Sequence, residues 1–379
     1  MLRIENFKSG HFVKAFQYNY FVPNKVNVEW TWESPLLNKL LERAAIKLGE
    51  LNSFARMVPN IDLYIQLHVA KEAVVSSKIE GTQTKIEEAL LSIEDIQPER
   101  RDDWQEVVNY IDAINSAIVQ LADLPLSSRL LRNTHALLMQ GVRGEHKQPG
   151  EFRQSQNWIG GSSLTDAVFI PPSQELVTDL MSDLEQFLHN DLIHVPDLIK
   201  IAIAHYQFET IHPFLDGNGR VGRLLITLFL VSQKILDKPL LYLSMYFEKN
   251  RNSYYDKLSA VRAKNDLHNW IAFFLIGIEE TASTAVYTLS QILKLKERIE
   301  KLIDQEFGRR SSVAKSLLKG LFQEPTITIE RASILTGLSF KAANDLVQLM
   351  QEKGILKEST GNQRNRVFIF EEYLQAFES

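Results

Sequence analysis

One short segment of the sequence concentrates residue types that can handle phosphate chemistry. It reads His-Pro-Phe-Leu-Asp-Gly-Asn-Gly-Arg-Val-Gly-Arg and runs from His212 to Arg223. Glycines let the backbone approach a ligand closely, and the free N–H groups at a helix N-terminus favour an anion. Because a helix is expected to begin near Gly219, the stretch from Gly217 to Arg220 is predicted to form a phosphate cradle.

The other polar residues of the segment meet the remaining needs of a nucleotide site. Arg220 and Arg223 add fixed positive charge for phosphate oxygens. Asp216 offers the hard oxygen ligand that Mg²⁺ takes together with substrate phosphates. His212 could act as a general base, because imidazole titrates near neutrality. Each fragment alone is usually structural, but their combination within twelve residues has no simple packing explanation, and it is not a Walker A loop.

Helices must position this segment, since most of the sequence has the apolar spacing of helices. The pattern predicts helices over residues 61–79, 103–121, 173–188, 197–210 and 219–233. The phosphate segment joins the last two. Residues 156–172 are the exception, because turn residues and paired prolines bound short apolar runs there, which predicts a β-hairpin.

The C-terminal part of the chain has a different pattern. A charged helix over about 289–305 leads into three short helices over 311–321, 328–335 and 340–353, and then into strands over 355–358 and 366–370. Three helices followed by two strands are typical of a winged helix. We therefore expect a mainly α protein with an N-terminal helical region over 1–110, a core over 111–288, and a linker helix plus winged helix-turn-helix domain over 289–379.

Composition narrows the class of protein further. The chain has 379 residues, no cysteine, and 42 Lys+Arg against 47 Asp+Glu, which gives a net charge of −5. The absence of cysteine excludes disulfides, thiolate nucleophiles and zinc sites that need sulfur. The N-terminus lacks the apolar run of a signal peptide, and no stretch approaches the ~18 apolar residues of a membrane span. We expect a cytoplasmic protein with no membrane partner.

The segment from His212 to Arg223 resembles, at every position, the H-x-F-x-D/E-G-N-G-R-x-x-R motif of the Fic family, whose members mostly transfer AMP from ATP to protein hydroxyls. The resemblance extends to Pro-Gly-Glu-Phe-Arg at 149–153, Asn-Trp-Ile-Gly-Gly at 157–161 and the Tyr-Tyr pair at 254–255, and so covers roughly residues 30–290. It implies a Fic-type helical bundle with a β-hairpin flap.

The resemblance also implies roles for single residues. His212 would deprotonate a Tyr, Thr or Ser hydroxyl of the target, Asp216 would hold Mg²⁺ on the α- and β-phosphates, and Arg223 would meet the γ-phosphate. The flap would pair with a strand-like segment of the target. AMP would move by in-line displacement at the α-phosphorus, with pyrophosphate leaving. The residues expected to contact ATP are Glu80, Ile159, Gly160, Gly161, Asp216, Gly217, Asn218, Gly219, Arg220, Val221, Gly222, Arg223 and Tyr254.

A second motif lies earlier in the chain, at Ser76-Ser-Lys-Ile-Glu80-Gly81. Ser76 and Glu80 are four residues apart and share a helical face, and a carboxylate in a last turn opposes the helix dipole. Alone, the motif fits a solvated glutamate beside a glycine cap. It resembles the inhibitory helix of the Fic family, whose glutamate pairs with the second motif arginine and blocks the γ-phosphate position. The resemblance implies an inhibitory helix over about 61–81, carrying Ser76, Glu80 and Gly81, and a pair of Glu80 with Arg223.

Several alternatives stay open. The same site could remove AMP from a modified protein, or use another nucleotide-linked donor. A different class of function is also possible: a DNA-binding regulator that acts through the winged helix, with Arg364 and Arg366 in the wing. Against it, residues 291–379 hold 14 Lys+Arg and 12 Asp+Glu, a difference of only +2. A protein-docking or homodimer-forming module is the other option. ATP, a hydroxyl-bearing target protein and the enzyme itself are the expected partners.

Overall fold

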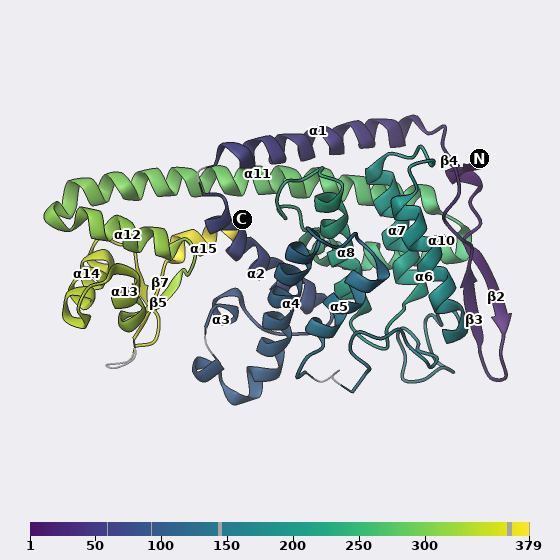
Figure 1. Cartoon of the computed structure of the whole chain (residues 1–379), viewed down its shortest axis with the longest axis horizontal. Coiled ribbons are helices and arrows are strands. Elements are labelled where there is room, and N and C mark those ends of the chain that lie inside the picture. Colours follow the sequence, from purple (N-terminus) through teal and green to yellow (C-terminus); the bar gives the residue numbers. More distant parts are fainter. Residues whose placement is uncertain (59, 92, 143–145, 362–365, 379) are drawn as a thin grey trace.

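Helices build most of the molecule (Figure 1). The computed structural model describes residues 1–58, 60–91, 93–142, 146–361 and 366–378. The helices up to the end of the core are α1 (Pro35–Met57), α2 (Asp62–Ile79), α3 (Ile86–Ala89), α4 (Arg101–Gln120), α5 (Ser128–Leu138), α6 (Gln174–His189), α7 (Asp197–Ile211), α8 (Asn218–Ser232), α9 (Ser244–Lys249), α10 (Arg251–Lys264) and α11 (Leu267–Glu306). The mainly α fold expected from the sequence is confirmed, and the five predicted helices are present as α2, α4, α6, α7 and α8 with ends shifted by two residues at most.

The core is centred on α7. Every residue of this helix from Leu198 to Ile211 is buried, because α6, α8 and α11 pack around it. A helix that is buried on all sides has no free face on which to slide or rotate. The loop that connects α7 to α8 therefore starts and ends on fixed points, while α2 and α4 pack against the next part of α8.

The N-terminal segment forms two small sheets that were not predicted from the sequence. Strand β1 (Leu2–Arg3) runs parallel to β4 (Trp30–Thr31), and β2 (Gly10–Lys14) pairs antiparallel with β3 (Asn19–Pro23). The hairpin of β2 and β3 projects from the end of the molecule opposite the C-terminal tail (Figure 1). It also touches the predicted flap, since Phe21 N–H donates to Ile170 O at 2.9 Å.

The flap itself differs from the hairpin predicted over residues 156–172. A single bridge joins Ile159 and Phe169, and no regular strand surrounds it in this described segment. Two consecutive glycines, Gly160 and Gly161, take φ values of 67° and 74°, which turn the chain out of the extended conformation needed for a ladder. The segment is therefore a loop held closed by one bridge.

A 40-residue helix joins the core to the tail. Helix α11 is continuous from Leu267 to Glu306, so the boundary predicted at 288/289 falls inside one helix, and α1 packs along it (Figure 1). After it come α12 (Ser311–Leu321), α13 (Ile329–Thr336), α14 (Phe340–Glu352) and α15 (Glu371–Glu378). Strands β5 (Thr326–Thr328), β7 (Val367–Ile369) and β6 (Lys357–Glu358) form an antiparallel sheet in that order. The three predicted helices and two predicted strands are present in the predicted order, whereas strand β5, between α12 and α13, and helix α15 were not predicted.

The last helix returns from the tail to the core. Helix α15 packs on α11, and its Phe377 ring lies 6.2 Å from the ring of His68 on α2. The C-terminal tail therefore contacts the helix that was predicted to be inhibitory. Among the described residues, no helix has both the length and the apolar character to cross a bilayer.

A substitution in helix α8 tests how much the packing of the core contributes to the stability of the protein. Leu224 is fully buried there, whereas Leu192, after α6, is 83% exposed. We expect Leu224→Ala to lower the free energy of unfolding by about 2–5 kcal/mol, because it leaves a cavity that neighbours cannot fill. Leu192→Ala is the matched control and should change it by less than about 0.5 kcal/mol. Equal effects in urea denaturation would contradict this description of the core.

Candidate active site

The loop between α7 and α8 is shaped by two left-handed residues. His212 ends α7 with φ 50°, and Gly217 precedes α8 with φ 71°. The Asn218 side chain closes the loop, since its Oδ1 accepts from Phe214 N–H and its Nδ2 donates to Phe214 O, both at 2.8 Å. A Cβ at position 217 would crowd Met139 and the His135 ring, so both the φ angle and the space require glycine.

Arg153, just before the flap, and Asn157, near its start, hold this loop in place. Arg153 is 2% exposed and donates to His212 O at 2.9 Å and to Pro172 O at 2.5 Å. Burial lowers its pKa to about 10. Asn157 Nδ2 donates to Phe214 O at 2.8 Å. Both side chains satisfy carbonyl groups that a buried loop would otherwise leave unpaired.

His135 on α5 is a further support that sequence reasoning missed. Its ring stacks on Phe214 with centroids 3.9 Å apart and planes 8° apart. Nδ1 accepts from Gly150 N–H at 2.9 Å, so the proton is assigned to Nε2, which donates to Asp216 O at 3.1 Å. Burial lowers its pKa to about 4. No motif surrounds this histidine, so only its position in the fold reveals it.

The imidazole of His212 is half-buried at the start of the loop. Its Nδ1 is buried and has no hydrogen-bond partner among the residues that the structure describes. Burial, and then the positive charges of Arg262 and Arg153, lower its pKa to about 3. The ring is therefore neutral near pH 7 and able to accept a proton.

A carboxylate occupies the predicted phosphate cradle. A Cβ added to Gly219 would collide with Glu80 Oε1, so the Glu80 carboxylate lies directly against the backbone at the first turn of α8. Helix N-termini present unpaired N–H groups and favour negative charge. Glu80 thus takes a position in which an anion is favourable, and only glycine at position 219 leaves room for it.

The same carboxylate is bound to Arg223. Arg223 Nη2 donates to Glu80 Oε1 at 2.7 Å and to Ser76 O at 2.8 Å, and its Nε donates to Ser76 Oγ at 2.8 Å. Burial disfavours the charged form of Glu80, but Arg223 outweighs it and holds the pKa of this carboxyl below its ordinary value. The structure therefore brings together Ser76, Glu80 and Arg223, and Gly81 continues the chain directly after Glu80 with φ 110°.

Arg220 lies behind the cradle rather than at its surface. It is buried, and its Nη1 forms an ion pair with Glu106 Oε2 on α4 at 3.2 Å. Its Nη2 lies 3.6 Å from the sulfur of Met139, and its Nε has no partner among the described residues. Arg220 supplies positive charge beneath the helix N-terminus, fixed by α4 and α5.

Asp216 is the exposed member of the loop. Its Oδ1 accepts from the neighbouring Gly217 N–H at 2.6 Å, and the rest of the carboxylate faces solvent. Val221 and Gly222, for which nucleotide contacts are predicted, are both buried inside α8. Val221 N–H is bonded to Gly217 O, and Gly222 packs against Glu209.

Tyr254 is also buried. The side chain is 1% exposed and stacks on Phe247 with centroids 4.3 Å apart. His205 Nδ1 donates to Gly222 O at 2.8 Å, so its Nε2 accepts from the Tyr254 hydroxyl at 2.9 Å. Packing and hydrogen bonding place Tyr254 in the core, and its predicted contact with adenine stays a prediction. Its neighbour Tyr255 is 40% exposed instead.

The flap residues predicted near the nucleotide are placed as a group. Ile159 pairs with Phe169, and Gly160 and Gly161 are exposed at the following turn. Asp166 closes the tip by accepting hydrogen bonds from Ser162 and Ser163, which lowers the pKa of its carboxyl. The flap also exposes two apolar side chains, Trp158 at 40% and Val168 at 79%.

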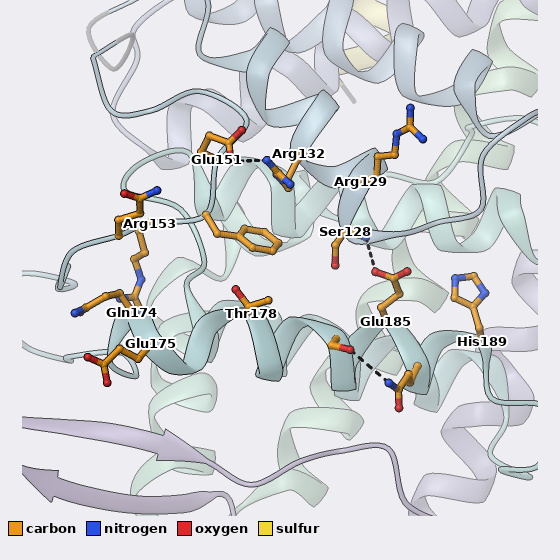
Figure 2. A pocket seen from close by; sticks show the side chains of 14 residues that line it. Ser128, Arg129, Arg132, Glu151, Arg153, Gln174, Glu175, Thr178, Glu185 and His189 are labelled. Carbon is orange, nitrogen blue, oxygen red and sulfur yellow. Dashed lines mark hydrogen bonds and ion pairs between the residues drawn. The ribbon is translucent and has the colours of Figure 1, made fainter.

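A polar cavity of 840 Å³ lies on the other side of Arg153 (Figure 2). Helices α5 and α6 and residues 151–154 line it, and the side chains drawn include the Arg132–Glu151 pair and Glu185, which accepts from Ser128 N–H. Neither His212 nor the cradle lines this cavity. It is therefore separate from the site at the N-terminus of α8, although Arg153 touches both.

The fold and this loop define a Fic-type helical protein. Residues 38–119 match the Fic/DOC family N-terminal region, and residues 125–230 match the Fic/DOC family. The two matches place this part of the chain, from residue 38 to residue 230, in the Fic/DOC family.

The chain is also similar in sequence and in fold to individual proteins. The chain is 28% identical over 225 residues to the protein adenylyltransferase Fic of Drosophila erecta, covering 59% of this chain and 39% of that protein. It is 31% identical over 145 residues to that of Aedes aegypti, covering 38% and 26%. The chain thus spans about two fifths or less of these relatives. A Fic family protein from Desulfovibrio desulfuricans shares its fold, with TM-score 0.56, 21% identity, and coverage of 89% of this chain and 96% of that one.

The lowered pKa of His212 yields a prediction about titration. An unfolded imidazole protonates near pH 6.5, so a folded pKa of about 3 means that the native ring stays neutral while the pH falls from 7.5 to 5. Stability gained from this difference is complete above pH 6.5 and declines below it. We expect the NMR signals of His212, assigned with His212→Ala, to stay constant over this range in the nucleotide-free protein. A midpoint near 6.5 would contradict the burial described.

Proposed function

We propose that the chain is a protein adenylyltransferase that moves AMP from ATP to a hydroxyl side chain of a target protein and of itself, and that Glu80 inhibits it. The observation that carries the proposal is the contact of the Glu80 carboxylate with both Arg223 and the Gly219 backbone. An anion already sits where a phosphate would be stabilised. The names of the relatives support the type of reaction.

His212 is the proposed base. Its Nδ1 is buried, which leaves Nε2 to meet a substrate hydroxyl. Nε2 takes the proton, the hydroxyl oxygen forms a bond to the α-phosphorus, and the bond to the bridging oxygen breaks so that pyrophosphate leaves. The rigid loop fixes the position of the His212 ring relative to the phosphate cradle. Such positioning accounts for much of the rate enhancement in phosphoryl transfer.

Asp216 is the proposed Mg²⁺ ligand. Its carboxylate is exposed at the loop, and the described residues contain no cluster of three or more His, Asp or Glu side chains that would hold a metal alone. Mg²⁺ commonly takes one or two carboxylates and completes its shell with water and substrate phosphates, so a single carboxylate beside the cradle fits. The metal, when bound, neutralises charge on the departing pyrophosphate.

The inhibitory contact is suited to release. Arg223 is 2% exposed at its side chain, but Glu80 is 36% exposed, so solvent screens the pair from one side. Ser76 keeps two hydrogen bonds to Arg223 when Glu80 leaves. A γ-phosphate can then replace the carboxylate without leaving the arginine unpaired. We propose that ATP binds in the resting state and that its α-phosphate is aligned only after Glu80 moves.

The tail is proposed to be a winged helix that docks protein rather than DNA. Ile334 and Phe340 are 65% and 63% exposed in the helix-turn-helix segment. Lys353 is paired with Glu306, and Arg366 donates to Asn344, while Arg364 lies outside the described residues. Exposed apolar side chains, and a charge of only +2 over residues 291–379, favour a protein partner such as a second copy of the chain. We also propose a cytoplasmic location and a division into an N-terminal helical region over 1–110, a core over 111–288 and a C-terminal part over 289–379.

Labelled nucleotides test the proposed reaction. Purified protein is incubated with Mg²⁺ and ATP labelled at either the α- or the γ-phosphate. We expect covalent α-label that rises at least about tenfold in Glu80→Gly, since one charge-assisted contact of about 1.5–3 kcal/mol is removed from the resting state. The double variant Glu80→Gly, His212→Ala should lose the label.

Glu99→Gly is the matched control, because Glu99 is exposed in a short turn at residues 98–100. It should behave as the unaltered protein does. Covalent γ-label would indicate a kinase. Label that is absent from every variant would contradict adenylyl transfer and favour AMP removal or another donor.

A further inference from the structure

One arginine contacts both the flap and the helix that leads into His212. Arg262 lies on α10, and its Nε donates to Thr210 Oγ1 while its Nη2 donates to Glu209 O, both at 3.2 Å. Thr210 and Glu209 belong to the last turn of α7, just before His212. The same guanidinium covers the ring of Phe169, with Cζ 4.0 Å from the ring centroid. A single planar group therefore joins the second arm of the flap to the end of α7.

Phe169 is the point at which this arm is held. Its side chain is 8% exposed, and Phe21 of β3 also packs against it, with ring centroids 5.9 Å apart. Its backbone forms the bridge to the first arm, since Ile159 N–H donates to Phe169 O at 2.8 Å and Phe169 N–H donates to Ile159 O at 3.1 Å. At the bridge, the position of the first arm therefore follows that of Phe169.

The flap borders the loop that carries His212. Asn157, near the start of the flap, donates to Phe214 O of that loop at 2.8 Å. Trp158 and Val168 are exposed on the two arms that follow. A polypeptide whose hydroxyl reaches His212 therefore lies next to the flap, and the position of the flap affects where that hydroxyl is placed.

The contact at Phe169 uses properties that only arginine combines. A guanidinium donates hydrogen bonds in its plane while its face stacks on an aromatic ring, whereas a lysine ammonium has no plane. The two donors of Arg262 fix this plane relative to α7, and the stacking fixes Phe169 relative to the plane. The separation between the end of α7 and the flap is thereby defined by one side chain.

The backbone that carries Arg262 is itself anchored. Helix α10 packs on α11, and its residues Tyr254 and Leu258 are buried. Ser9 Oγ donates to Arg262 O at 3.2 Å, and Ser9 N–H donates to Asn265 Oδ1 at 2.8 Å. Arg262 therefore projects from a fixed helix, which allows it to hold the flap rather than to follow its movement.

We propose that Arg262 is a positioning residue that holds the flap at a fixed distance from the end of α7 and so places the acceptor hydroxyl at His212 Nε2. It acts through Phe169 and not on ATP, whose proposed cradle lies at the N-terminus of α8. The placement of the hydroxyl rests on the proposed adenylyl transfer, whereas the restraint on the flap does not. Loss of Arg262 should therefore slow the transfer without weakening the use of ATP.

Self-labelling with α-labelled ATP tests this in the Glu80→Gly background. Arg262→Met should lower the maximum rate at least about tenfold, because the acceptor is misplaced, and should leave the KM for ATP within about twofold. Arg262→Lys should not restore the rate, since it keeps the charge but loses the plane. Lys264→Met is the matched control, because Lys264 is an exposed cation on the same helix, and it should change neither value.

Amide hydrogen exchange tests the restraint without an enzymatic readout. In Arg262→Met, and in Phe169→Leu as a second variant, the amides of Ile159 and Phe169 should exchange at least about threefold faster than in the unaltered protein. Exchange in α7 and α8 should stay unchanged, which would show that both variants are folded.

Three results would overturn the inference. They are unchanged exchange in the flap of Arg262→Met, equal acceleration in α7 and α8, and a KM for ATP that rises as much as the maximum rate falls. Faster exchange confined to the flap, with no α-label in any variant, would keep Arg262 as the residue that positions the flap and would reject the adenylyltransferase.

Discussion

The structure depends on how one buried arginine is paired. Arg223 is 3% exposed within α8, and an unpaired guanidinium there would carry a large desolvation cost. Helix α2 and the residue after it supply the acceptors: Arg223 donates hydrogen bonds to the Ser76 hydroxyl, the Ser76 carbonyl and the Glu80 carboxylate. The position of α2 is thereby tied to the helix that builds the phosphate cradle. In the proposed mechanism, a γ-phosphate can reach Arg223 only when it replaces the Glu80 carboxylate, so productive ATP binding and inhibition would be two outcomes of one interaction.

The loop between α7 and α8 is held rigidly next to Arg223. His212 and Gly217 reverse the chain with left-handed backbone angles, and the carbonyls that this exposes are bonded by Arg153, Asn157 and the Asn218 side chain. None of these groups can accept or donate a proton easily near pH 7 in its buried setting. Among the described side chains of this loop, His212 keeps an imidazole nitrogen without a hydrogen-bond partner, which is why it is the proposed general base.

Local signals explain which features could be predicted from the sequence. Apolar periodicity located the core helices, because packing demands it, and the spacing of His212, Asp216 and Arg223 located the loop and its charges. Features that depend on distant partners could not be predicted from the sequence. Tyr254 turns inward because of His205, 49 residues earlier, and His135 supports the loop across 81 residues to Asp216. The flap glycines prevented the ladder that turn signals indicated, and the hairpin of β2 and β3 has no strong turn motif.

The most direct test is whether Glu80 occupies the place of the γ-phosphate. Calorimetry would compare Mg²⁺-ATP with Mg²⁺-ADP on His212→Ala, which prevents turnover, and on the same protein with Glu80→Gly added. If Glu80 and the γ-phosphate compete for Arg223, the preference for ATP over ADP is small in the first protein and rises about tenfold or more in the second. An ATP-to-ADP preference that is the same in both proteins would show that the Glu80 carboxylate and the γ-phosphate do not share a site.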